Sequence, residues 1–274
     1  MKLPLSIKKS ITFNCAMLFA GLLHYRCVTF AKIFPMDLML INLTFITRNF
    51  AFVYVLNEYS RHKSPINENI IIHQSYPNEF NINVLTSSSV DAVTYYYIKN
   101  SFASSFIDFD VCNLWYFIIL MFYFEIIFDF FHYWLHRLLH ENRFLYRHIH
   151  KKHHKFAHPI PILTYYQEPL DLFLSNTIPT VLTLMFSPSM SLFEFNVILV
   201  CKTCVEVSGH AGRRLYPSHS FSNCVWLPRI FGIQLYTEDH DKHHSINNCN
   251  YGKRFSLWDR VFGTYVSTYD DNDM

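Results

Sequence analysis

Long apolar stretches constrain the fold of this chain more than any other feature of its sequence. Five of them stand out among the 274 residues, and about 20 apolar residues in a helix are enough to cross the hydrocarbon core of a bilayer. Charged residues make up only 16% of the chain, against roughly 25% in soluble domains, which also indicates contact with lipid. The stretches cover about 11–31, 36–57, 114–131, 162–186 and 190–207.

The five stretches differ in how well they suit a membrane. Residues 114–131 are almost all aromatic or aliphatic and form the clearest membrane helix. The second stretch contains Arg48, and a central arginine costs roughly 2.5–3.5 kcal/mol on insertion. Arg48 must therefore reach the interface or face other helices, unless the segment itself lies in the interface. The last two stretches are separated by Pro188, and together they predict a helical hairpin that dips into the bilayer.

The rest of the sequence suggests how the chain is divided. Residues 1–60 are expected to form N-terminal membrane segments, and 61–112 a polar loop or insert with little structure of its own. Residues 113–268 contain the histidine motifs, and 269–274 are a short tail. No run of short alternating strands occurs. The predicted fold is all-α: an integral membrane helical bundle of about four membrane helices, including the hairpin, with a cytosolic histidine-rich helical cap.

Charge indicates the orientation and excludes one class of partner. The formal net charge of +2 is too small to predict nucleic-acid binding. Under the positive-inside rule, the basic residues that follow the third stretch predict that this side faces the cytosol. The hairpin returns the chain to the same side, so both groups of histidines are expected to face the cytosol. The basic residues are Arg137, Arg143, Arg147, Lys151, Lys152 and Lys155.

Histidines are concentrated in two places. Eight of the sixteen lie between His132 and His158. Because residues i, i+3 and i+4 share one face of a helix, a His-x2-His-His triplet is expected to aim three rings at one point. Neutral imidazole is a common ligand of Zn, Cu, Fe and Ni, so such triplets predict metal binding. The two triplets are His150-Lys-Lys-His153-His154 and His240-Asp-Lys-His243-His244.

The number of histidines indicates more than one metal. His132, His136 and His140 form a further ladder at i, i+4 and i+8, near one helix face. Eight or nine clustered histidines are too many for one ion, so two metals are predicted. No His-Glu-x-x-His segment occurs, which argues against the common zinc peptidase signature. Nitrogen-rich sites without cysteine suit Fe(II) that reacts with dioxygen, and zinc and copper are also allowed.

The order of these motifs resembles the fatty acid hydroxylase / sterol desaturase superfamily of membrane di-iron enzymes. That family carries His-x3-His and then two His-x2-His-His motifs, which here match His136-Arg-Leu-Leu-His140 and the two triplets. The flanking segments Phe-His-Tyr-Trp-Leu-His-Arg and Trp-Asp-Arg-Val-Phe-Gly-Thr are also similar to the family. The resemblance covers roughly 113–268, which it identifies as a fatty acid hydroxylase-like catalytic domain.

The resemblance implies nine metal ligands and no catalytic side chain beyond them. The family has a further histidine in a His-small-Gly context, which His210-Ala-Gly matches. His132 stands where relatives usually have an aromatic residue, so we expect it to pack or to support a ligand. Some relatives have another histidine where this chain has Arg214, and we do not expect His219 to replace it. The implied ligands are His136, His140, His150, His153, His154, His210, His240, His243 and His244.

Other residues near the motifs have smaller expected roles. Four acidic side chains are candidates to orient the rings by hydrogen bonding to them, with solvated surface charge as an equal alternative: Glu238, Asp239, Asp241 and Asp259. Five histidines are expected to have no metal role: His24, His62, His73, His148 and His158.

The resemblance also implies an activity. Members are expected to use two Fe ions and O2 to hydroxylate or desaturate a lipid of sterol or fatty-acyl type in lipid biosynthesis. Electrons come from cytochrome b5 or a similar donor with an NAD(P)H-linked reductase, and the membrane is the endoplasmic reticulum or an equivalent. The alternative is a non-redox membrane protein that holds zinc with the same histidines.

Overall fold

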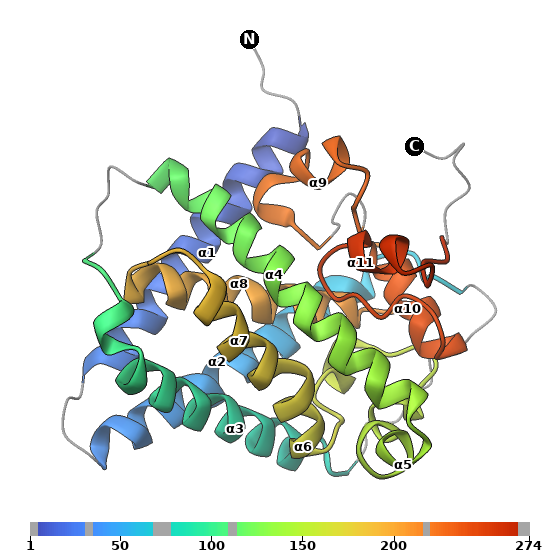
Figure 1. Ribbon diagram of the computed structural model, residues 1–274, viewed down its shortest axis with the longest axis horizontal. Helices are drawn as coiled ribbons and strands as arrows, with labels where there is room; N and C mark the ends of the chain where they lie inside the picture. Colours follow the sequence, from blue (N-terminus) through green and yellow to red (C-terminus); the bar gives the residue numbers. More distant parts are fainter. Residues whose placement is uncertain (1–4, 31–34, 68–77, 109–113, 216–219, 268–274) are drawn as a thin grey trace.

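The computed structural model describes residues 5–30, 35–67, 78–108, 114–215 and 220–267, and every regular element within these ranges is a helix (Figure 1). The all-α prediction is therefore confirmed for this part of the chain. The α-helices are α1 (Leu5–Phe30), α2 (Met36–Arg61), α3 (Phe80–Ser101), α4 (Leu114–Glu141), α5 (Arg143–Leu145), α6 (Pro169–Leu172), α7 (Ile178–Phe186), α8 (Leu192–Gly209), α9 (Leu227–Ile230), α10 (Thr237–Ile246) and α11 (Leu257–Val261).

Four helical segments are long and apolar enough to cross a membrane, as predicted. They are Ile7–Phe30, Met36–Arg61, Tyr116–Glu141 and Pro169–Phe186. The last runs from α6 through one π-helical turn, η6 (Phe173–Thr177), into α7. Residues 187–191 then turn the chain into α8, whose start is capped by Ser191 and Glu194.

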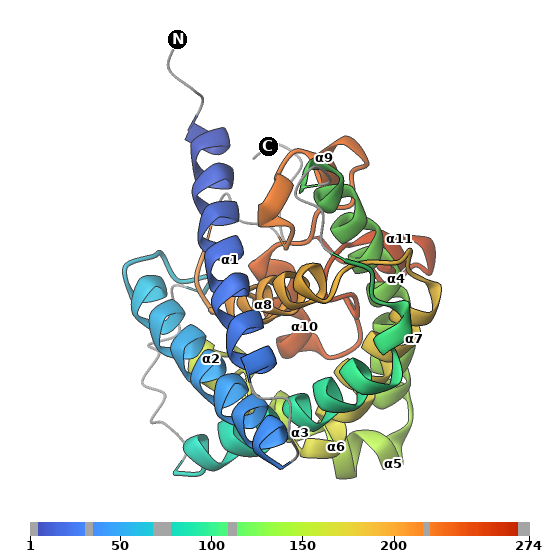
Figure 2. The ribbon, with the colours of Figure 1, turned by 90° about the vertical axis from the view of Figure 1, so that its left-hand side faces the viewer.

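Helix α8 lies inside the bundle, and α1 packs across it (Figure 2). Most side chains of α8 are buried, including the charged Lys202. The two helices approach closely at Gly21, where an added Cβ would lie only 2.6 Å from Cγ2 of Val197. A side chain at position 21 would therefore push α1 away from α8.

Helix α3 corrects the expectation that the polar region after α2 has little structure. The helix is 22 residues long, and its polar residues face α2. Asn49 donates to the Ser88 hydroxyl at 3.0 Å, and Lys99 pairs with Asp37 at 2.9 Å. Small and polar side chains stabilise contacts between membrane helices by hydrogen bonding across the interface. The polar residues that predicted a loop thus include those on the buried face of a helix.

Arg48 faces other helices, which is one of the alternatives that the sequence left open. Its guanidinium lies 3.6 Å from the Asp91 carboxylate on α3 and 4.2 Å from the centre of the Phe45 ring. Charged residues in membrane helices usually point into the bundle and pair there. Arg48 follows that rule.

Helix α4 extends without a break beyond the predicted apolar stretch 114–131. It includes the clearest apolar stretch and continues to Glu141, so His136 and His140 lie on its last turns. Two buried acidic residues anchor the C-terminal part of the chain to it. Asp129 accepts three backbone N–H groups of residues 253–255, at 2.7 to 3.1 Å, and Glu125 accepts from the Arg254 guanidinium at 2.8 Å. This anchoring brings α10 and α11 to the end of α4.

Candidate metal centre

The structure gathers all nine predicted ligands into two adjacent groups. The potential ligand atoms of each group lie within 4.8 Å of one another. The groups touch, since the rings of His154 and His244 stack with their centres 4.5 Å apart. The five-histidine cluster consists of His136, His140, His150, His154 and His243, and the four-histidine cluster of His153, His210, His240 and His244.

The ligands come from four places in the chain. The end of α4 carries two, and His210 directly follows α8. The first triplet lies after α5, on a π-helical turn, η3 (Tyr146–His150), and a 3-10 turn, η4 (His153–Lys155). The second triplet lies on α10. Single π-helical turns occur frequently at functional sites, and here η3 places His150 against α4.

The triplets do not each aim three rings at one point, which corrects that expectation. In the first, His150 and His154 join the five-histidine cluster while His153 joins the other. The second triplet divides in the opposite sense, because His243 crosses to the five-histidine cluster. At 3.6 residues per turn, positions i+3 and i+4 lie on opposite sides of position i and about 100° apart. This geometry separates the rings on α10. The first triplet lies on π-helical and 3-10 turns, and its i+3 ring also joins the other cluster.

The ring nitrogens in the five-histidine cluster are spaced as ligands of a single ion would be. Nε2 of His150 lies 3.1 Å from that of His136, 3.0 Å from that of His140 and 3.1 Å from that of His154. In the four-histidine cluster, Nε2 of His210 lies 3.3 Å from that of His153 and 3.2 Å from that of His240. Nitrogens bound at about 2.0–2.1 Å to one metal are separated by roughly 3 Å.

Hydrogen bonds at the other ring nitrogen orient several of these histidines. Nδ1 of His136 donates to the Tyr251 carbonyl at 2.8 Å, and Nδ1 of His243 donates to the Cys249 carbonyl at 2.7 Å. Nδ1 of His210 donates to the Glu206 carbonyl at 2.8 Å. A carbonyl oxygen can only accept, so Nδ1 carries the proton and the lone pair of Nε2 points into the cluster. Metal-binding histidines are commonly held in this way.

Several buried ring nitrogens have no hydrogen-bond partner among the described residues, which supports the metal interpretation. These unpartnered atoms include Nε2 of His243 and both ring nitrogens of His244. A buried polar atom without a partner costs about 1–3 kcal/mol. Metal ions bound between the rings would satisfy the inward-facing nitrogens.

Asp171 orients His150 through a charge, and sequence reasoning missed this role. Its two carboxylate oxygens each lie 2.9 Å from Nδ1 of His150, and both side chains are buried. Asp171 was visible in the sequence as one of a few polar residues at the start of an apolar stretch. That position is typical of a functional group in a membrane helix, but its partner depends on the fold.

Three of the four acidic residues named from the sequence bond to groups other than the cluster rings. Asp241 accepts from His158 at 2.7 Å, and Asp239 accepts from the Tyr236 backbone at the start of α10. Asp259 accepts the backbone N–H groups of Tyr251 and Gly252 at 2.8 and 2.7 Å. It therefore acts indirectly, because it holds the loop whose carbonyl orients His136.

Burial keeps six of the cluster histidines neutral at physiological pH, all of them outside the membrane segments. It lowers the pKa of His210 to about 4 and that of His243 to about 3. The pKa values of His153, His154, His240 and His244 are also lowered, first by burial and then by neighbouring histidines. Only a neutral imidazole offers a lone pair to a metal, so the clusters are ready to bind one.

The other histidines that the structure describes lie outside both clusters. His132 is buried beside His136 and donates from Nδ1 to the Ser175 carbonyl at 2.6 Å, as expected of a packing residue. His148 and His62 are exposed, His24 bonds to Asn196, and His158 bonds to Asp241. Arg214 is exposed. His73 and His219 lie outside the described residues.

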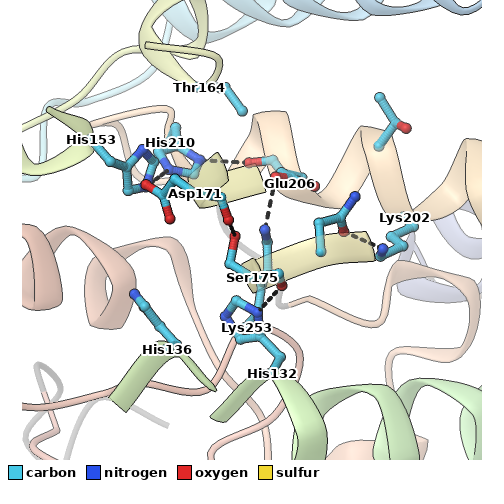
Figure 3. Close-up of polar contacts among 12 residues, drawn as sticks. His132, His136, His153, Thr164, Asp171, Ser175, Lys202, Glu206, His210 and Lys253 are labelled. Atoms are coloured by element: carbon cyan, nitrogen blue, oxygen red, sulfur yellow. Dashed lines mark hydrogen bonds and ion pairs between the residues drawn. The ribbon is translucent and has the colours of Figure 1, made fainter. Parts of the chain in front are cut away.

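A cavity of about 50 Å³ borders the four-histidine cluster, lined in part by His210, His240, Glu206 and Lys253. The Glu206 carboxylate pairs with the Lys253 ammonium at 2.8 Å. The neighbouring cations lower the pKa of Glu206 to about 2 against the opposing effect of burial. Figure 3 shows polar side chains extending from His153 and His210 past Glu206 toward Lys202.

Comparison with known proteins agrees with this geometry. The family described as fatty acid hydroxylase matches residues 121–264, a range that contains all nine cluster histidines. No solved structure matches the chain significantly.

Among characterised proteins, the chain is 35% identical over 157 residues to a fatty acid hydroxylase of Lecanicillium sp, covering 54% of this chain and 42% of that protein. It is 35% identical over 150 residues to a very-long-chain aldehyde decarbonylase of Oryza sativa subsp. indica, covering 52% of each. It is 34% identical over 143 residues to methylsterol monooxygenase 1 of Rattus norvegicus, covering 50% of this chain and 43% of that protein. The chain spans about half the length of these curated relatives.

Proposed function

Because the chain belongs to the fatty acid hydroxylase family, we propose that it is a membrane-bound, O2-dependent di-iron oxidoreductase that hydroxylates or desaturates a lipid. The observation that carries the proposal is the pair of adjacent all-nitrogen clusters at the end of a membrane helix. Nitrogen-rich sites without thiolate suit iron that reacts with dioxygen. The substrate is of sterol or fatty-acyl type, and the reaction belongs to lipid biosynthesis.

Each cluster would hold one iron ion, and together the ions would supply the activation of O2 and the oxidation of a C–H bond. The chain's own residues prepare this site. The three backbone carbonyls and Asp171 fix the orientations of four rings, and burial keeps His210 and His243 neutral. Most of the cluster histidines are buried, which limits the access of water.

The overall reaction needs an external source of electrons. Hydroxylation consumes O2, two electrons and two protons, and it yields an alcohol and one water. Desaturation consumes the same reactants and removes two hydrogens from the substrate, so it yields an alkene and two waters. We propose cytochrome b5 or a similar donor, reduced by an NAD(P)H-linked reductase, as the source.

The proposed location is the endoplasmic reticulum or an equivalent membrane, with both clusters facing the cytosol. Four apolar helical segments support membrane insertion. The basic residues that follow α4 support the orientation.

The decisive experiment is metal analysis with Mössbauer spectroscopy on the detergent-purified chain, expressed with isotopically labelled iron. About two coupled irons per chain, oxidised by O2 after reduction, are expected for this type of site. Two zinc ions that iron does not replace, with no O2 consumption, would instead favour a non-redox protein that holds zinc with the same histidines.

A further inference from the structure

A buried polar chamber lies inside the bundle, away from the histidines. Its volume is about 40 Å³, and residues of α2, α3, η6, α7 and α8 line it. Hydrogen bonds and an ion pair connect its polar side chains in a row. Arg48 pairs with Asp91 at 3.6 Å, Asn176 donates to Asp91 at 3.3 Å, and Lys202 donates to Asn176.

Lys202 is the unusual member of this chamber. Its side chain is buried, and its Nζ donates to two neutral oxygens, those of Asn176 and Thr180. It also lies 4.0 Å from the centre of the Phe128 ring. Within the described residues, no carboxylate lies within ion-pair distance of this ammonium. A buried cation normally needs a negatively charged or strongly accepting partner.

Three of the four charged residues that line the chamber have an ion-pair partner. Arg48 and Asp91 form one pair, and the second carboxylate, Glu206, is paired with Lys253, which lies outside the lining. In the described part of the chain, Lys202 is therefore the charged lining residue without an ion-pair partner. The chamber is suited to a ligand that contributes oxygen lone pairs.

An apolar groove lies on the outer side of the chamber. It has a volume of about 650 Å³ and lies between α3 and the η6–α7 segment, in the range of small-molecule binding sites. Val93, Tyr97 and Phe173 are exposed along it. The groove and the chamber share Thr94, Ile98 and Thr177 as lining residues, and the hydroxyls of the two threonines are 3.2 Å apart. These side chains separate the two spaces.

The inner side of the chamber leads toward the four-histidine cluster. Glu206 lines both the chamber and the cavity that borders His210 and His240. The three spaces thus follow one another: apolar groove, polar chamber, cavity beside the histidines. A lipid that entered through the groove would reach the histidines with its polar end first.

We propose that the chamber binds the polar head of the lipid substrate, an oxygen-bearing group no larger than a carboxyl group, while the hydrocarbon chain lies in the groove between α3 and α7. The proposal rests on the proposed function for its substrate being a lipid. A volume of 40 Å³ holds roughly three water molecules, so a phosphocholine or nucleotide head does not fit. Arg48, Asp91 and most of the groove lie outside the matched range 121–264.

Binding of tritiated lipids to the full chain in detergent tests the proposal without turnover. The probes are 1-hexadecanol, palmitate and cholesterol, with hexadecane as the molecule without a head and dipalmitoylphosphatidylcholine as the one with a large head. At least one of the first three is expected to bind saturably, and which one identifies the head. The proposal would be overturned if hexadecane bound with the same affinity as the three probes with small heads, or if the phospholipid bound more tightly than they do.

The substitution Lys202→Met tests the head contact, because methionine has a similar shape and no charge. The probe that binds is expected to lose about 10- to 100-fold in affinity, the effect of losing a hydrogen bond from a charged donor. Lys63→Met is the matched control, roughly 20 Å away from Arg48 along the axis of α2. An unchanged affinity in the Lys202 variant would refute the head contact.

The substitution Val93→Trp tests the groove by filling it. It is expected to weaken binding of every probe with a long chain, whereas Val55→Trp, at an exposed position on α2, is expected to leave binding unchanged. Photocrosslinking of the unaltered protein with a diazirine-bearing hexadecanol gives a second answer if a variant fails to fold. Labelling is expected in 89–102 and 173–181, and labelling confined to other segments would overturn the proposal.

Metal content measured on the same preparations separates the two proposals. If the protein contains iron and consumes O2 but binds lipid probes equally with and without a polar head, the head-binding role of the chamber is refuted and the oxidoreductase proposal stands. Head-dependent binding in a protein that holds no iron would refute the oxidoreductase proposal and leave the chamber standing.

Discussion

The two histidine clusters use the same ligand type but differ in their surroundings. The five-histidine cluster has a buried carboxylate, Asp171, behind His150. In the four-histidine cluster, His210 is held by a neutral backbone carbonyl, and two rings border a cavity. A carboxylate partner makes an imidazole a more basic ligand than a carbonyl does, and fewer protein ligands leave more room for an external one. The comparison indicates that the five-histidine cluster would hold a metal more tightly and that the four-histidine cluster would be more open.

The largest expected effect comes from removing, in each triplet, the one histidine that lies in a different cluster from the other two. His243→Ala is expected to lose the metal of the five-histidine cluster and His153→Ala that of the four-histidine cluster, so each variant retains about half of the metal. Activity is expected to fall below detection in both. Metal analysis of the purified variants measures this, with His62→Ala, at an exposed position, as the control. Full metal content in both cluster variants would contradict the assignment of these histidines as metal ligands.

The next effect concerns the carboxylate that distinguishes the clusters. Asp171→Asn removes the charge behind His150 and is expected to weaken metal binding at the five-histidine cluster about 10- to 100-fold. Binding at the other cluster is expected to change little. Competition with a chelator at increasing concentration measures both affinities. Asp241→Asn is the matched control, because that carboxylate bonds to His158, which lies in neither cluster. Equal weakening of both sites by the Asp171 variant would contradict the comparison.

Acid is expected to destabilise the metal-free protein through buried histidines of both clusters. The unfolded chain binds a proton at each histidine below pH about 6.5, whereas the folded His210 does so only below about 4 and His243 below about 3. The unfolded state therefore binds more protons, and stability falls as the pH decreases from about 6.5 to about 4, by about 1.4 kcal/mol per pH unit for each histidine. Stability is expected to be constant above pH 7.

Thermal melting of the metal-free protein across this pH range measures the effect. Ring signals in NMR spectra report which histidine is protonated first. A melting temperature that rises on acidification would contradict the assigned direction of the pKa shifts.

The smallest expected effect comes from changing His132, which lies at the edge of the five-histidine cluster. His132 touches His136 without belonging to either group, so His132→Phe is expected to leave the metal content unchanged. It removes the hydrogen bond to the Ser175 carbonyl, which costs about 1 kcal/mol and lowers the melting temperature slightly. Loss of one metal in this variant would show that His132 is a ligand.

Two elements show where sequence reasoning succeeded and where it went wrong in the fold. Helix α4 was visible because its apolar composition is intrinsic to the segment and needs no partner. Helix α3 was missed because its polar residues satisfy one another only against α2, as Asn49 and Ser88 do. The same reasoning applies to Arg48, whose partner Asp91 lies on that missed helix.

Imidazole as the proposed ligand type, the nine candidate histidines, the long apolar helices and the family could all be predicted from the amino-acid sequence. These properties depend on residue identity and on spacing within one segment. The division of the triplets between the clusters, the carboxylate that reaches a ring, and the polar chamber between the groove and the histidines became visible in the folded chain. Each of these depends on contacts between segments far apart in the chain, and helical periodicity determines the direction of a side chain but not what lies opposite it.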